Sequence, residues 1–393
     1  MITRSRLAAL LALVLAGQLI PMLPVGAAPS RSAPEPPRPA AAAIAAAATP
    51  VGQLVPASGQ FYPVRPVVAS ADVALTANTP KEVKLVGIGE VPNTEYLSVL
   101  AQVRVSGHTA TGNVRVYPPG DTSGSVMLLN YANGKNASTM DELPTSTGGK
   151  LTFVASTAVK LRIVVVGWYS GYEPLSATAG ATYLPLAPTR VLNAVRLTAG
   201  ATTVVPIAGA NGVGAAADVA AVNVVVAETS AAAAGYVQAY PTGTTVAETT
   251  AALYYATGEQ RSQAHVIPVG ADGSITVKSS AASNVTVYVQ GYYQKPTGRL
   301  AGATFQESYR SYVHSAAYTA GATKTATAAL GGNPASDVVA VAGRISAINT
   351  AAAGSVTTWP SGTAPVDASL LYNTSTRSHR RPKRCSRFPR RCP

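Results

Sequence analysis

The feature that most constrains this 393-residue chain is an internal repeat with a period of about 120 residues. One short pattern, with an aromatic residue before Pro and a Gly two positions later, occurs three times. It reads as Gly112-Asn-Val-Arg-Val-Tyr-Pro-Pro-Gly120, as Gly235-Tyr-Val-Gln-Ala-Tyr-Pro-Thr-Gly243 and as Gly354-Ser-Val-Thr-Thr-Trp-Pro-Ser-Gly362. Solenoid units have periods of about 20–50 residues. The longer period therefore predicts whole domains in tandem, which we call copy 1 (58–172), copy 2 (180–295) and copy 3 (302–376).

Within each copy the pattern of residues predicts an all-β fold. Short runs rich in Val, Thr and Tyr alternate with period two, as expected of half-buried strands. Turn residues separate these runs, and no run of helical length shows a period of 3.6. Strand-sized runs in copy 2 are Ala221–Val226, Tyr236–Tyr240, Ser274–Val277 and Val285–Val289. The spacing of the runs favours tandem antiparallel β-sandwich domains.

In these motifs the sequence resembles a family of secreted, cell-wall-associated tandem repeat domains common in actinobacteria. Copy 2 matches best, in an opening motif (Tyr183–Leu192), a central motif (Ala234–Gly243), a late hairpin (Val266–Gly273) and a closing strand (Gly291–Tyr293). The resemblance implies an extracellular accessory domain without known catalytic residues. The family usually has Asp-Thr-Arg after the opening motif, whereas this chain has Asn193-Ala-Val-Arg196.

Copy 3 follows the repeat to about Thr376 and then stops. The segment Arg377–Pro393 replaces the late hairpin and the closing strand, and eight of its 17 residues are Lys or Arg. One hypothesis is that this basic, Pro- and Cys-containing tail, expected to be disordered, is an out-of-frame extension of a domain that once continued. The rival hypothesis is a real basic tail that binds anionic wall polymer or lipid headgroups.

The N-terminus has the layout of a secretory signal peptide. Arg4 and Arg6 precede the apolar run Leu7–Val25, and small residues follow up to Ala27. We therefore predict a signal peptide over 1–27, cleaved near Ala27, in preference to a membrane anchor. Because no other run approaches the length needed to span a bilayer, we expect no transmembrane segment after cleavage. The protein is then secreted, extracellular or cell-wall associated.

The net charge of +13 does not belong to the repeats. Two positive charges lie in the signal peptide and eight in the tail, which leaves +3 for the residues between them. The Pro/Ala-rich segment 28–57 is predicted to be an extended linker. A strongly basic chain would suggest nucleic acid as a partner, but near-neutral domains argue against that class.

The sequence contains no recognisable catalytic, metal or cofactor motif. Both cysteines, Cys385 and Cys392, lie in the tail, and a zinc site there would need two more ligands. The histidines, among them His108 and His265, have no carboxylate or second His nearby in the sequence. We therefore predict no cofactor, no metal, no catalytic residue and no enzyme activity.

The candidate binding residues are the aromatic side chains of the repeated pattern, Tyr117, Tyr240 and Trp359. An aromatic ring at a strand end can stack on a sugar, and it can equally pack over the end of the sandwich. The favoured function is a non-enzymatic structural or adhesive protein of the cell surface. The alternative is a module that binds carbohydrate or cell-wall polymer through aromatic loops. The expected partners are wall polysaccharide or another surface protein.

Overall fold

The computed structural model describes residues 59–94, 97–120, 126–170, 180–245, 253–297, 302–305, 316–327, 339–343, 345, 347, 350–359 and 370–372. Copies 1 and 2 belong to one compact unit. The predicted signal peptide (1–27), linker (28–57) and basic tail (377–393) lie outside the described residues.

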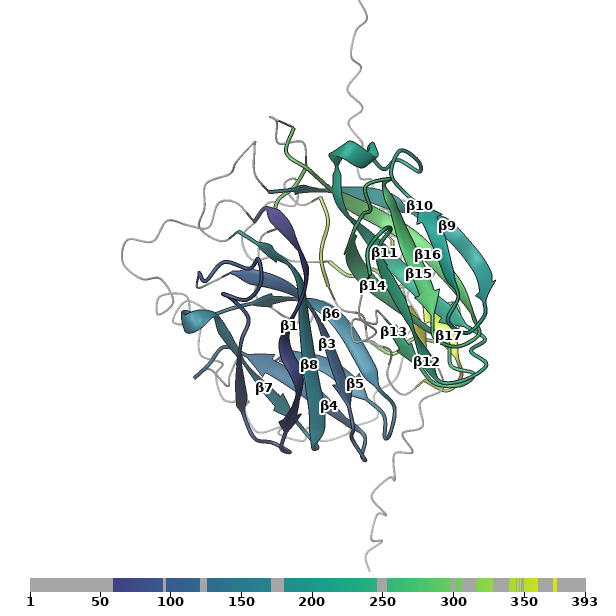
Figure 1. Cartoon of the computed structure of the whole chain (residues 1–393). Helices are drawn as coiled ribbons and strands as arrows, with labels where there is room; N and C mark the ends of the chain where they lie inside the picture. The colour runs from purple at the N-terminus through teal and green to yellow at the C-terminus, as the bar shows by residue number, and fades with distance from the viewer. Residues whose placement is uncertain are drawn as a thin grey trace, which may run out of the picture. The chain divides into compact units, whose positions relative to one another are not determined.

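Copy 1 folds into two four-stranded antiparallel sheets (Figure 1). Their orders are β1-β8-β3-β6 and β2-β7-β4-β5. The strands are β1 (Phe61–Leu75), β2 (Lys81–Lys84), β3 (Ser98–Ser106), β4 (Gly112–Tyr117), β5 (Val126–Tyr131), β6 (Ala137–Pro144), β7 (Lys150–Ala155) and β8 (Val159–Tyr169), with a 3₁₀ turn η1 (Thr147–Gly149) before β7.

Copy 2 repeats this arrangement strand for strand. Its sheets have the orders β9-β16-β11-β14 and β10-β15-β12-β13. The strands are β9 (Thr182–Leu197), β10 (Thr202–Pro206), β11 (Val219–Thr229), β12 (Gly235–Pro241), β13 (Leu253–Tyr255), β14 (Arg261–Pro268), β15 (Ser274–Ser279) and β16 (Ser283–Gln294), with η2 (Ala216–Asp218) before β11.

The strand order identifies copies 1 and 2 as jelly rolls, in which eight antiparallel strands form two sheets through Greek-key connections. The first and last strands of a copy are neighbours, as β1 and β8 show. The predicted all-β antiparallel sandwich is therefore confirmed. The predicted late hairpin is wrong, because β14 and β15 lie in different sheets. The turn itself forms, with Gly273 N donating to Gly270 O at 2.9 Å, but it carries the chain from one sheet to the other.

Copies 1 and 2 each have their own core, built by alternation along the central strands. Side chains of one parity point between the two sheets and are fully buried, and those of the other parity face outward. The inward residues include Val99, Ala101, Val103 and Val105 of β3 and Val222, Val224 and Val226 of β11. The outward residues of these strands are left to contact other parts of the chain.

The segment that follows copy 1 returns to pair with the start of copy 1, and the segment that follows copy 2 does the same with copy 2. Phe61 and Ala181 exchange backbone hydrogen bonds of 2.8 and 2.7 Å, and Tyr183 and Ala303 exchange bonds of 2.7 and 2.8 Å. Phe305 N also donates to Gly59 O at 2.8 Å. These bonds place the opening aromatic residues of the three copies close together.

An aromatic cluster joins the copies, composed of Phe61, Tyr169, Tyr183, Tyr293 and Phe305. The Phe61 ring lies 5.1 Å from that of Tyr169 and 4.4 Å from that of Tyr293, and Tyr169 lies 4.5 Å from Phe305. The hydroxyls of Tyr169 and Tyr293 are 2.7 Å apart. Tyr169 is 1% exposed and Tyr293 is 8% exposed. The cluster thereby covers part of the outward face of sheet β1-β8-β3-β6 in copy 1 and of sheet β9-β16-β11-β14 in copy 2.

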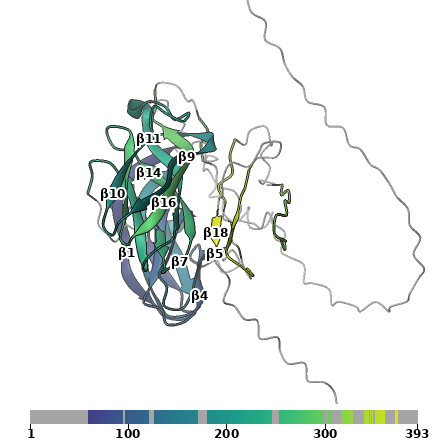
Figure 2. The same ribbon diagram turned by 90° about the vertical axis from the view of Figure 1, so that its right-hand side faces the viewer.

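In the described part of copy 3, the strands are β17 (Gly354–Val356) and β18 (Leu370–Tyr372). β18 is the yellow arrow in Figure 2. The two strands pair with Gly354 opposite Tyr372, as Gly112 pairs with Tyr131 in copy 1 and Gly235 with Tyr255 in copy 2. Copy 3 therefore retains the hairpin of the other copies in the same register.

Candidate functional site

The three candidate aromatic residues lie at the end of the same strand in their own copies, or shortly after it. Tyr117 ends β4 and is 8% exposed, so packing covers most of its ring. Tyr240 lies in β12 opposite Thr276 and is half-buried. Trp359 follows β17 and is also half-buried. Of the three, Tyr240 borders a cavity.

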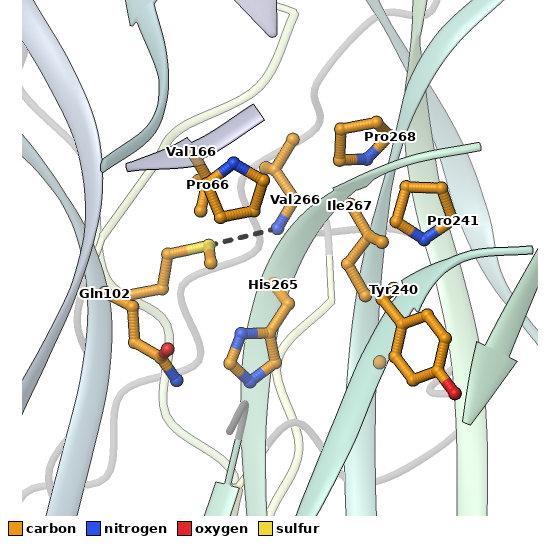
Figure 3. Close-up of a pocket in the computed structure, with 11 residues that line it drawn as sticks. Pro66, Gln102, Val166, Tyr240, Pro241, His265, Val266, Ile267 and Pro268 are labelled. Atoms are coloured by element: carbon orange, nitrogen blue, oxygen red, sulfur yellow. Dashed lines mark hydrogen bonds between the residues drawn. The ribbon is translucent and has the colours of Figure 1, made fainter. Parts of the chain in front are cut away.

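That cavity lies where copies 1 and 2 meet (Figure 3). Its volume is about 40 Å³, and its lining includes Gln102, Met140, Tyr240 and His265. The N–H of Val266 donates to the sulfur of Met140 at 3.2 Å, the dashed line in Figure 3. A space of this size holds a few water molecules, whereas pockets for drug-sized ligands occupy several hundred Å³. The cavity is therefore much smaller than a pocket for a drug-sized ligand.

The two buried histidines have structural positions. His265 lies in β14, as the strand-like sequence around it predicted, and burial lowers its pKa to about 3. Its ring is therefore neutral, and Nε2 makes no hydrogen bond. His108 is packed 4.5 Å from the ring of Tyr131, and its Nε2 lies 2.8 Å from Ala132 O. Among the described residues, no group of three or more His, Cys, Asp and Glu side chains could hold a metal ion.

A buried carboxyl in copy 2 escaped the sequence analysis. Glu228 of β11 is 0% exposed, and neither carboxyl oxygen has a hydrogen-bond partner. Burial, with a smaller effect from the negative charge of Glu259, raises the pKa of Glu228 to about 8. Glu228 pairs with Val285, as Val105 pairs with Leu161 in copy 1. The carboxyl therefore stands where copy 1 has a core valine.

An ionic network on the outer face of copy 1 was also missed. Asp72 accepts from Arg162 through both Nε and Nη2 and from Nη2 of Arg104 at 2.8 Å. These hydrogen bonds, above all the one from Arg162, hold the pKa of Asp72 below its ordinary value although burial opposes the shift. Arg104 also donates through Nη1 to the hydroxyl of Tyr254 in copy 2, at 2.8 Å. The network thus connects β1, β3 and β8 of copy 1 to β13 of copy 2.

A bulge in β1 places Asp72 in this network. Ser70 pairs with Ile163 and Val73 with Leu161, so two residues on β1 oppose one on β8. Asp72 has a φ of 54° within the bulge, and Ala194 has a φ of 46° at the corresponding place in β9. Bulges re-aim side chains in this way. The sequence alone does not indicate this bulge, because the residues with positive φ, Asp72 and Ala194, are not glycines.

Replacing Asp72 by asparagine should lower the free energy of unfolding by about 1–3 kcal/mol at pH 7, because two partly buried guanidinium groups lose their counter-charge. Urea unfolding measures the loss. Glu82→Gln is the matched control, since Glu82 pairs with Lys150 on the exposed surface at 3.1 Å and such pairs contribute about 0–1 kcal/mol. An equal effect of the two changes would contradict a role for the buried network.

Comparisons with known proteins add little to this picture. No family model matches the sequence, and no curated protein matches it. Solved structures show distant likeness to the major capsid protein P2 from bacteriophage PM2, at 12% identity over 58% of this chain and 97% of that one, with a TM-score of 0.16. The STIV MCP has 11% identity, 60% and 97% coverage and a TM-score of 0.17. YhhW from Escherichia coli has 11% identity, 57% and 97% coverage and a TM-score of 0.19.

TM-scores of this size carry no argument about function. The assignment as a tandem jelly-roll protein rests on the strand order of its sheets. Within the described segments, no helix is long and apolar enough to cross a membrane.

Proposed function

We propose that the chain is a non-enzymatic, exported structural or adhesive protein of the cell surface or the extracellular space. Its signal-peptide-like N-terminus and Pro/Ala-rich linker support export. The resemblance of its repeat motifs to secreted wall-associated domains supports the location. The two jelly rolls supply a scaffold with a substantial core in each copy.

One observation carries the non-enzymatic part of the proposal. Strongly shifted ionisable groups mark active sites when they line an accessible cleft. Here the groups with large shifts, Glu228 and His265, are 0% and 2% exposed, and the shifted tyrosines Tyr169 and Tyr293 lie in the aromatic cluster. Their side chains are almost fully covered by other parts of the described chain, which supports a structural role for these groups.

The test of export is the intact mass of the protein recovered outside the cell. We expect a chain that begins near residue 28, and the same measurement reveals whether residues 377–393 are present. Recovery of the full-length chain, uncleaved and inside the cell, would contradict the proposal. A screen of the purified protein against wall polymers should show no turnover.

The competing function, binding of carbohydrate or wall polymer, has its own test. We expect no saturable binding to purified peptidoglycan or polysaccharide at low salt in a pulldown assay. If the protein shows saturable binding and Tyr240→Ala abolishes it, the result would contradict a purely structural role and support polymer binding. Tyr318→Ala is the matched control, because Tyr318 is 50% exposed and lies outside the repeated aromatic positions.

A further inference from the structure

The hairpin of copy 2 contacts the outer face of copy 1 through a position that all three hairpins share. Tyr254 directly precedes Tyr255, which pairs with Gly235; the residues at the same place are Asn130 in copy 1 and Leu371 in copy 3. Arg104 of β3 donates to the Tyr254 hydroxyl at 2.8 Å, and its guanidinium lies 5.5 Å from the centre of the ring. The contact is polar and aromatic.

The hairpin of copy 3 contacts the outer face of copy 2 at the equivalent place. Leu371 packs against Val225, Ala227 and Tyr288. The N–H of Leu371 donates to Ser262 Oγ at 2.8 Å. The side chains in this contact between copies 2 and 3 pack through apolar surfaces.

The two contacts use equivalent surfaces. Ladder pairing makes Ala227 the counterpart of Arg104, because Leu100 pairs with Gly167 as Asn223 pairs with Gly291. Strand β6 of copy 1 contacts β13, and its counterpart β14 in copy 2 contacts β18. In each case the outer face of one copy receives the hairpin of the next copy. The hairpin and the outer face that it contacts are different surfaces, so the copies associate head-to-tail.

We propose that the outer face of each jelly roll is a docking surface for the hairpin of the copy that follows it, and that one residue pair selects the hairpin. The pair is Arg104 with Tyr254 between copies 1 and 2, and Ala227 with Leu371 between copies 2 and 3. A guanidinium covered by leucine would lose water without gaining a hydrogen-bond acceptor, which penalises the wrong combination. The pairs therefore fix the order in which the copies pack.

A double-mutant cycle in the full chain tests the proposal. The variants are Ala227→Arg, Leu371→Tyr and the two together, which recreates the Arg104–Tyr254 combination on copy 2. The readout is hydrogen exchange of the amide at residue 371, which donates to Ser262 in the docked state. We expect Ala227→Arg to speed this exchange ~10-fold or more, and the double variant to restore it to within ~3-fold of the parent.

Controls separate docking from folding. Copy 1 carries Arg104 at the position equivalent to 227, so the outer face of this strand has room for an arginine side chain, although copy 2 has Ala194 where Asp72 pairs with Arg104 in copy 1. Should Ala227→Arg nevertheless unfold copy 2, Leu371→Asp replaces it, because residue 371 lies outside the core of the sandwich; it should speed exchange around β18 without lowering the unfolding midpoint. Asn130→Tyr, at the exposed equivalent position in copy 1, should leave exchange at residue 371 unchanged.

Two results would overturn the proposal. The first is a double variant that exchanges as fast as Ala227→Arg alone. The second is exchange at residue 371 that neither Ala227→Arg nor Leu371→Asp alters.

Discussion

Replacing Glu228 by valine should raise the free energy of unfolding at pH 8 by roughly 4 kcal/mol. The carboxyl is 0% exposed and makes no hydrogen bond, and its pKa rises from 4.5 to about 8 on folding. Each pKa unit corresponds to about 1.4 kcal/mol between the folded and unfolded states. Valine is the residue that copy 1 has at this position, as Val105. The substitution therefore removes the penalty without changing the packing pattern of the strand.

The same substitution should remove a pH dependence. Below pH 4.5 the carboxyl of Glu228 is protonated in both states, and it imposes no ionisation penalty. As pH rises from 4.5 to 8, the unfolded chain releases a proton that the folded chain retains, so the contribution of Glu228 to the stability of the parent protein falls. Urea unfolding between pH 7 and 8.5, where His265 is neutral in both states, measures this slope, which should be nearly flat over the same range in Glu228→Val.

The reciprocal variant, Val105→Glu, should impose the same loss on copy 1. Parent stability that stays constant or increases from pH 7 to pH 8.5 would contradict the assignment of a buried, protonated Glu228. On the acid side His265 acts in the opposite direction, because its pKa falls from 6.5 to about 3 on folding. Stability should therefore also decline as pH falls below 6.5, in the parent and in Glu228→Val alike.

Truncating Tyr169 to alanine should cost about 3–5 kcal/mol, the range for removing a large buried aromatic side chain. Tyr169 is 1% exposed and contacts the rings of Phe61, Tyr293 and Phe305. Since these rings belong to three copies, the loss should fall on the contact between copies as well as on copy 1. We expect calorimetry to resolve one cooperative transition in the parent and two in Tyr169→Ala.

Tyr169→Phe is the matched variant. It keeps the ring and removes only the hydroxyl that lies 2.7 Å from the hydroxyl of Tyr293. Its cost should be about 1–3 kcal/mol, the penalty for a buried hydroxyl without a partner, and the single transition should persist. If Tyr169→Ala also unfolds in one transition with a loss below that of Tyr169→Phe, the cluster does not join the copies.

The local pattern of the sequence was sufficient to predict several of the strands. Runs such as Ala221–Val226 and Val285–Val289 lie inside β11 and β16, because alternation of Val with other residues matches the two faces of a strand. The order of the strands was beyond such reasoning. The partner of β1 is β8, about 100 residues away, and nothing in a local pattern specifies that pairing. The turn Gly270–Gly273 was predicted as part of a hairpin for the same reason.

Sequence reasoning about the site succeeded where the repeat gave an alignment and failed where copies meet. The alignment placed Tyr117, Tyr240 and Trp359 at the ends of equivalent strands or shortly after them. It did not connect Arg104 with Tyr254, which are 150 positions apart. Glu228 could have been noticed, because a carboxyl that ends the run Val-Val-Val-Ala-Glu at an inward position conflicts with the strand around it. That conflict becomes visible once the face of each residue is known.

The pairing of first and last strands has a mechanical consequence. Phe61 lies opposite Tyr169 and Thr182 lies opposite Gln294, so the chain enters and leaves each copy at the same end of one ladder. A pulling force along the chain would separate these strands one hydrogen-bonded pair at a time, as a zipper opens, instead of shearing the whole ladder at once. Each opened copy would release roughly 350 Å of extended chain. A tether built from such units would lengthen under tension as its copies unfold. The ring contact between Phe61 and Tyr169 would be the first to break.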